Sequence, residues 1–181
     1  YLPLRNRLWI NDIVDELPID NGTDSISAGW RQSSFALNGS GSAVGVSTDN
    51  PPHRVYVGTS SGTCFKVDNA HTATPTFSNI SNFEGASGNI NCIAVDPENG
   101  DHAMAIFSNY NVHSIHFTED GGTTWFRAGG NLESESAPDG FPENLYNIGP
   151  APSIRWAKIL DVSGGKVYFV GTSVGLFVTQ N

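Results

Sequence analysis

One strand pattern occurs three times along this chain. Residues 55–62 read Val-Tyr-Val-Gly-Thr-Ser-Ser-Gly, residues 167–175 repeat this as Val-Tyr-Phe-Val-Gly-Thr-Ser-Val-Gly, and residues 102–108 take the same place in a diverged middle copy. Each copy follows an apolar stretch and an acidic turn, and each precedes a further apolar stretch. Short apolar runs separated by Gly, Asn and Pro turns indicate strands and not helices. We therefore predict an all-β protein built from tandem copies of one antiparallel strand unit.

The middle copy contains the strongest turn signal of the chain. Residues 119–123 read Glu-Asp-Gly-Gly-Thr and lie between predicted strands at residues 114–118 and 124–127. Adjacent glycines supply the positive φ angles that a tight hairpin needs, and the Asp120 carboxylate can accept backbone N–H groups that the turn leaves unpaired. Trp125 follows the turn, and we expect its ring to be buried against the neighbouring sheet.

This hairpin resembles the Asp-box of BNR-type β-propellers, which include sialidase-like and sortilin-like proteins. The pattern Ser/Thr-x-Asp-x-Gly-x-Thr-Trp is filled at every defined position, by Thr118, Asp120, Gly122, Thr124 and Trp125. The resemblance implies that these residues are structural and not catalytic.

Three further segments resemble the repeat propellers of large exported bacterial proteins, which often carry a type IX secretion sorting domain. The segments are residues 108–112, 149–157 and 168–177. This resemblance implies a secreted or cell-surface protein.

On this interpretation the chain is a partial β-propeller of four-stranded antiparallel blades. Residues 42–83 and 90–130 form two complete blades, and residues 154–181 form an incomplete one. Residues 1–37 are the tail of a preceding blade, and residues 131–153 form a long loop between blades. Propellers close with about four to eight blades. We therefore expect the remaining blades to come from further sequence or from another chain.

Composition narrows the choice of partners. The formal net charge is −9, which argues against nucleic acid as a ligand because phosphate contacts need clustered Lys and Arg. No apolar run approaches the length of a membrane span, so we expect no membrane insertion. Cys64 and Cys92 lie on different predicted strands. Burial as two small hydrophobic side chains is favoured over a cross-strand disulfide.

Four residues are candidates for ligand binding because they lie in or beside loops between strands. Tyr110, Tyr146 and Trp156 carry flat rings that can stack on sugars or anchor peptides. For Trp156, packing between blades is the favoured alternative, and for the two tyrosines both interpretations remain open. Arg155 begins the inner strand of the last unit.

The sequence offers weaker signals for catalysis. Sialidases use three arginines and a tyrosine nucleophile, but beside Arg155 the corresponding places hold Ser42 and Asn91. Propeller glycosidases that act on xyloglucan need two facing carboxylates. The long loop supplies acidic residues, which we expect to be solvated: Glu133, Glu135, Asp139 and Glu143. His113 and His116 are three residues apart and are expected to face opposite sides of a strand, so we predict no metal site and no cofactor.

Two functional hypotheses follow from the sequence. The first is a non-catalytic propeller module of an exported or cell-surface bacterial protein, which serves as a binding or adhesion scaffold for a carbohydrate or protein ligand. The second is a fragment of a propeller glycoside hydrolase of the sialidase-like or xyloglucan-degrading type. A convergent pair of carboxylates, or a cluster of arginines, would favour the second.

Overall fold

Strands are the main secondary structure of the described chain. The computed structural model describes residues 1–16, 28–109, 112–134, 149–150, 153–163 and 165–180. Within these residues the only helical elements are two short 3-10 turns, Val14–Glu16 and Gly130–Leu132. The predicted all-β fold is confirmed.

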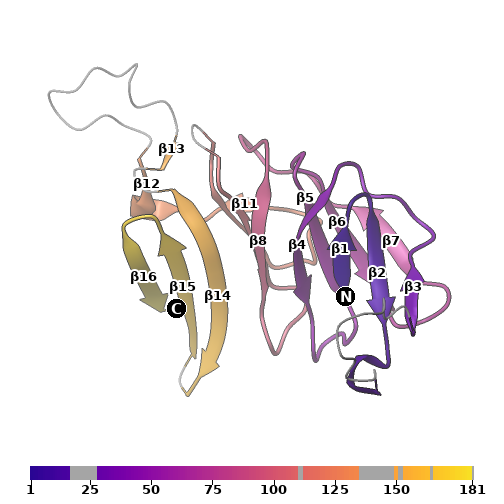
Figure 1. Cartoon of the computed structure of the whole chain (residues 1–181). Helices are drawn as coiled ribbons and strands as arrows, with labels where there is room; N and C mark the ends of the chain where they lie inside the picture. Colours follow the sequence, from indigo (N-terminus) through magenta and orange to yellow (C-terminus); the bar gives the residue numbers. More distant parts are fainter. Residues whose placement is uncertain (17–27, 110–111, 135–148, 151–152, 164, 181) are drawn as a thin grey trace, which may run out of the picture.

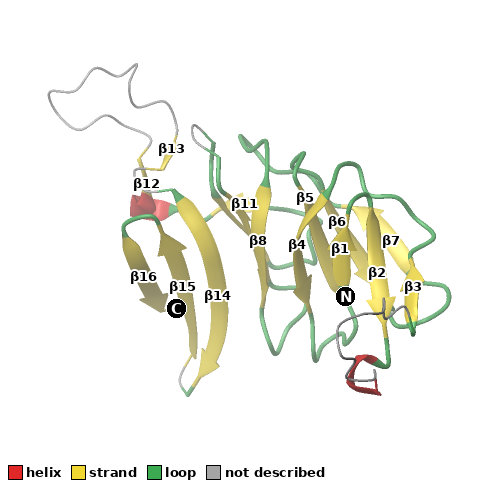
Figure 2. Ribbon diagram, in the orientation of Figure 1, coloured by secondary structure: helices red, strands yellow, loops and turns green. Residues whose placement is uncertain are grey.

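Four antiparallel sheets of three or four strands each stand side by side (Figures 1 and 2), and we number these sheets blades 1 to 4 in chain order. Blade 1 contains β1 (Leu2–Leu4), β2 (Arg7–Asn11) and β3 (Trp30–Gln32); blade 2 contains β4 (Gly41–Val46), β5 (Val55–Thr59), β6 (Cys64–Asp68) and β7 (Thr76–Asn79). Blade 3 contains β8 (Ile90–Val95), β9 (Ala103–Phe107), β10 (Ile115–Thr118) and β11 (Phe126–Arg127); blade 4 contains β14 (Ile154–Val162), β15 (Gly165–Thr172) and β16 (Gly175–Gln180). Two four-stranded and two three-stranded blades agree with the predicted partial propeller.

The first strands of blades 2, 3 and 4 lie next to one another and form the inner row of the stack (Figure 1). Each of these inner strands, β4, β8 and β14, contains an irregularity in its pairing near its start. The extra residue there is Ser42 in β4, Asn91 in β8 and Arg155 in β14. The three repeats can therefore be aligned residue by residue, as the sequence pattern indicated.

The core of the protein lies between the blades. β5 and β9 are buried along their whole length, because each contributes one face to the preceding blade and the other face to the next. Val55 and Val57 pack with blade 1, whereas Tyr56 between them packs with blade 3. This alternation follows from the two-residue period of a strand. The residues on both faces of β5 and β9 must therefore be apolar over most of their surface.

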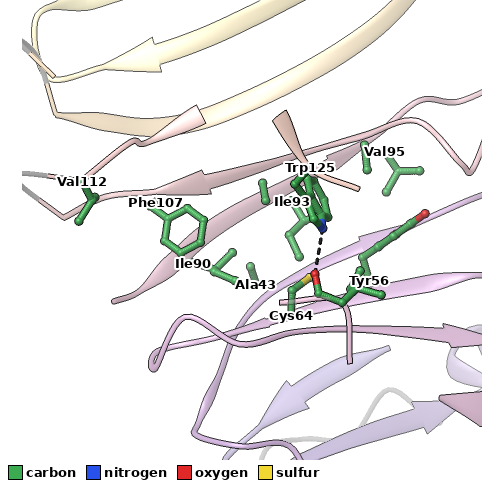
Figure 3. Packing of buried hydrophobic residues seen from close by; sticks show 12 residues of the cluster. Ala43, Tyr56, Cys64, Ile90, Ile93, Val95, Phe107, Val112 and Trp125 are labelled. Carbon is green, nitrogen blue, oxygen red and sulfur yellow. Dashed lines mark hydrogen bonds between the residues drawn. The ribbon is translucent and has the colours of Figure 1, made fainter. Parts of the chain in front are cut away.

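Trp125 is the largest side chain between blades 2 and 3 (Figure 3). It is 8% exposed, and its Nε1 donates a hydrogen bond to the Ile80 carbonyl at 2.9 Å, drawn as the dashed line in the figure. Its ring also contacts Phe83, with ring centroids 4.7 Å apart. A buried indole needs such an acceptor for its N–H. The prediction that Trp125 packs against the neighbouring sheet is confirmed.

Cys64 and Cys92 are free thiols, and both are buried. Cys64 lies between blades 2 and 3, whereas Cys92 lies between blades 3 and 4. Both therefore pack as small hydrophobic side chains, and the disulfide alternative is wrong.

No helix in the described ranges is long and apolar enough to cross a membrane.

The importance of blade packing can be tested with two tryptophans in opposite settings. We expect Trp125→Ala to lower the free energy of unfolding by about 3–5 kcal/mol, because it leaves a cavity between two blades. Trp156 is 61% exposed, so Trp156→Ala serves as the matched control and should change stability by less than about 1 kcal/mol. Denaturant titration measures both. Equal losses in the two variants would contradict this account of the core.

Candidate functional site

Polar side chains gather where the three inner strands begin. We call Ser42, Asn91 and Arg155, with Asn89 and Asn109 beside them, the polar rim. These side chains are exposed or half-buried, in contrast to the buried faces of the neighbouring strands. The rim is therefore the place where consecutive blades present hydrogen-bonding groups to solvent.

Hydrogen bonds tie the rim together from blade to blade. Ser42 Oγ donates to the Ile90 carbonyl at 2.7 Å, and Asn91 Nδ2 donates to the Arg155 carbonyl at 2.6 Å. In both cases the extra residue of one inner strand donates to a carbonyl near the start of the next inner strand, although the acceptor in β14 lies one residue further along than in β8. In addition, the Asn89 backbone N–H donates to Asn109 Oδ1 at 2.8 Å. The rim is consequently a fixed polar edge and not a set of independent side chains.

Arg155 ends this row with its side chain exposed. Its backbone carbonyl is used by Asn91, but within the described residues its guanidinium has no ion-pair partner. A guanidinium offers five N–H donors in a planar fork, which suits carboxylates and sugar hydroxyls. Arg155 is therefore the strongest ligand-binding group among the described rim residues.

Trp156 does not join this rim, although it is adjacent to Arg155 in sequence. It pairs with Gly171, in the same register as Ala43 with Gly58 and Cys92 with Ile106. Ala43 and Cys92 are both buried beneath the following blade. Trp156 at the equivalent position is 61% exposed, so packing of its ring between blades stays a prediction. The other two aromatic candidates, Tyr110 and Tyr146, lie outside the described residues.

The turn after β10 lies at the opposite ends of the strands from the rim. Asp120 Oδ1 accepts hydrogen bonds from Thr118 Oγ1 at 2.9 Å and from the Thr124 backbone N–H at 2.8 Å, and Asp120 Oδ2 accepts one from Thr124 Oγ1 at 2.6 Å. Gly122 has a φ of 83°, and a Cβ added there would lie 2.5 Å from Ile80 Cδ1. Both observations require glycine at this position. All of these contacts hold the turn, so the carboxylate acts structurally.

Glu133 is buried, contrary to the expectation that the acids of the long loop are solvated. One of its oxygens, Oε1, accepts the backbone N–H groups of Ser114 at 2.5 Å and Ile115 at 2.9 Å, and Oε2 lies 3.3 Å from His113 Nδ1. These contacts cap the start of β10. The other loop acids lie outside the described residues: Glu135, Asp139 and Glu143.

The start and end of the long loop also pair with each other. β12 (Glu133–Ser134) and β13 (Gly149–Pro150) form a short antiparallel pair. This corrects the expectation that residues 131–153 contain no strand. Neither segment alternates over enough residues to signal a strand in the sequence.

His113 and His116 have different partners, and only His116 lies within a strand. His116 is fully buried, its Nε2 lies 3.1 Å from the Glu84 carbonyl, and its ring packs edge-on against Phe83 and Phe107. His113 instead faces Glu133. The described residues contain no group of three or more His, Cys, Asp or Glu that could hold a metal ion.

Ion pairs between blades were missed by sequence reasoning. Arg54 of blade 2 pairs with Asp68 at 2.5 Å and also with Asp101 of blade 3. Lys166 of blade 4 donates to Asp96 of blade 3 at 3.1 Å. The partners in these inter-blade pairs are 47 and 70 residues apart. No local pattern in the sequence could have identified them.

The chain was also compared with known proteins. Neither a scan against protein-family models nor a search of curated proteins finds a match. The assignment of function therefore depends on the geometry described above.

The structural role of the turn after β10 can be tested by removing the Asp120 carboxylate, which accepts its hydrogen bonds. Desolvation would raise the pKa of Asp120, but the hydrogen bonds from Thr124 and Thr118 outweigh it and hold the pKa below its usual range. We expect Asp120→Ala to lower the free energy of unfolding by about 1–3 kcal/mol because backbone donors lose their partner. The exposed neighbour Glu119→Ala is the control, measured by thermal unfolding. An unchanged melting temperature for Asp120→Ala would contradict the structural role.

His116 makes stability depend on pH. Burial is the largest cause of its lowered pKa; the Glu84 carbonyl opposes this effect, while His113 and Arg127 add to it. The unfolded chain therefore binds a proton at a pH where the folded protein does not, so stability falls as the pH decreases below about 6.5. His116→Gln should weaken this fall between about pH 7.5 and about pH 5.5, whereas the exposed His71→Gln should not. Urea unfolding at both pH values measures the loss of unfolding free energy. A loss in His116→Gln equal to that of the unsubstituted protein would refute this role of His116.

Proposed function

We propose that this chain is a non-catalytic β-propeller module of an exported or cell-surface bacterial protein, where it serves as a binding or adhesion scaffold. The polar rim carries this proposal. Three consecutive blades place a hydrogen-bonding side chain at the same register, and the row ends at the exposed Arg155. A row of amides, hydroxyls and a guanidinium suits a carbohydrate or a polar protein surface.

The contacts of three acidic side chains also support a scaffold function. Asp120 holds a turn, Glu133 caps a strand, and Asp96 binds Lys166 of the next blade. Each of these carboxylates already has structural partners, whereas glycoside hydrolysis needs two carboxyl groups that face a substrate. None of these three carboxylates is therefore available for the pair that the alternative, a propeller glycoside hydrolase, requires.

The turn after β10 resembles an Asp-box, which supports the assignment to BNR-type propellers. A secreted or cell-surface location is supported by the resemblance of three segments to exported bacterial repeat proteins: residues 108–112, 149–157 and 168–177. The acidic net charge of −9 agrees with a ligand other than nucleic acid.

The proposal can be tested by binding and turnover in parallel. The protein is applied to an array of defined glycans with extracellular-matrix proteins spotted alongside. We expect retention on at least one class, and Arg155→Ala should weaken that binding about tenfold or more, because a charged donor contributes about 1.5–3 kcal/mol. Lys158→Ala, an exposed cation on the same strand, is the matched control.

Three results would contradict the proposal. Release of sialic acid from sialyllactose, or of reducing sugar from xyloglucan, would assign a hydrolase. Full binding by Arg155→Ala would place the ligand away from the rim. A loss of the same size in Lys158→Ala would show that any nearby charge suffices.

A further inference from the structure

The sequence contains three Asn-Gly pairs: Asn21–Gly22, Asn38–Gly39 and Asn99–Gly100. In such a pair the backbone nitrogen of glycine can attack the side-chain amide of asparagine, because glycine has no Cβ to hinder the approach. The reaction needs an asparagine side chain that is free to turn and a glycine N–H that is not already donating. Asn21–Gly22 lies outside the described residues, so the other two pairs can be compared.

The fold occupies both reacting groups of Asn99–Gly100. Asn99 Oδ1 accepts the Asp101 backbone N–H at 3.0 Å. The Gly100 N–H donates to the Asn50 carbonyl at 2.5 Å, and Gly100 is buried. The attacking nitrogen and the amide that it would attack are therefore both held in other hydrogen bonds.

Asn38–Gly39, just before β4, is in the opposite state. Asn38 is exposed. Within the part of the chain that the structure describes, its side chain makes no hydrogen bond and the Gly39 N–H has no acceptor. Gly39 has a φ of 107°, and a Cβ added there would lie 2.4 Å from Ser61 Oγ. The fold itself therefore requires glycine here and keeps the reactive pair.

Two hydroxyl groups act on the peptide unit that joins Asn38 to Gly39. Ser61 Oγ and Thr63 Oγ1, from the turn between β5 and β6, each donate to the Asn38 carbonyl oxygen at 2.6 Å. When the Gly39 nitrogen loses its proton, the negative charge is shared with this oxygen. Donors already aimed at an oxygen where charge develops stabilise the charged state. The two hydroxyls therefore favour the form of Gly39 that can attack.

We propose that Asn38 is a site of spontaneous deamidation in the folded protein, and that Ser61 and Thr63 promote the reaction. The deprotonated Gly39 nitrogen forms a bond to Asn38 Cγ. The bond between Cγ and the side-chain nitrogen breaks, and this nitrogen leaves as ammonia with a proton from water. A second water molecule then opens the succinimide ring at one of its two carbonyl carbons, which yields aspartate or isoaspartate. The net reaction consumes one water and releases one ammonia.

The modification changes both charge and backbone. A carboxylate at Asn38 makes the net charge one unit more negative than −9, and isoaspartate adds a methylene to the main chain. Asn38 lies four residues before Ser42 of the polar rim, so the change falls where blade 2 begins. The proposal does not depend on the function proposed for the rim.

The two described pairs can be compared in one experiment. The 181-residue protein is incubated in mildly alkaline buffer beside synthetic peptides of residues 35–42 and 96–103. Trypsin separates the two asparagines into peptides 32–54 and 67–127, and mass spectrometry measures aspartate and isoaspartate in each. We expect Asn38 to react in the folded protein at least as fast as in its peptide. Asn99 should react at least about tenfold more slowly than in its peptide, because it must first open locally.

The role of the hydroxyls is tested by substitution. We expect Thr63→Val and Ser61→Ala each to slow the reaction of Asn38 by about threefold or more, because each removes a donor to the oxygen that becomes charged. Ser60→Ala, an exposed serine in the same turn, is the matched control and should leave the rate unchanged. Because the comparison of Asn38 with Asn99 uses the unsubstituted protein, the test remains decisive if a variant fails to fold.

Three outcomes would overturn the proposal. Equal protection of Asn38 and Asn99 in the folded protein would show that the free side chain and N–H do not matter. Aspartate without isoaspartate would show direct hydrolysis of the side chain and not attack by Gly39. An unchanged or faster reaction in folded Thr63→Val and Ser61→Ala would show that the hydroxyls do not promote the reaction.

Discussion

The structure depends on strands that are apolar on both faces. A strand such as β5 or β9 cannot turn one side to water, so blades 2 and 3, which contain these strands, each lie between two other sheets. Burial of this kind is the dominant favourable contribution to folding. Because the described chain has no long helix to cover these faces, neighbouring sheets cover them, and the turns and ion pairs adjust how each sheet contacts the next. Tyr56 shows the adjustment, because its ring fills an interface and its hydroxyl donates to the Gly100 carbonyl at 2.6 Å.

Polar side chains have different roles at the two ends of the strands. At one end Asp120 and Lys166 are used to hold turns and neighbouring blades together. At the other end, where the inner strands begin, Ser42 and Asn91 donate to two backbone carbonyls, and the Arg155 side chain is exposed. A ligand can therefore be bound at the rim without breaking a contact that the fold needs. This separation of roles agrees with the scaffold function that we propose.

The sequence predicted the parts of the structure that have a local cause. The strand repeats, the turn at Asp120 and the burial of Trp125 follow from periodicity, glycine conformation and ring size, and these agree with the structure. Glu133 was misjudged, because an acid in a proline-rich loop reads as solvated unless its partners, the N–H groups at the start of β10, are already known. The pairing of Asp96 with Lys166 could not be predicted from the sequence for the same reason, because it forms only when two blades pack together.

The irregular pairing in each inner strand has a consequence for how such a protein can diversify. A bulged residue stands outside the strict alternation of its strand, so its side chain is not committed to either buried face. Within this one chain the position holds a hydroxyl, an amide and a guanidinium at Ser42, Asn91 and Arg155. The residues after the first two, Ala43 and Cys92, remain packed against the next blade. Duplicated blades can thus acquire new recognition chemistry one unit at a time, and no compensating change in the stacked interior is needed.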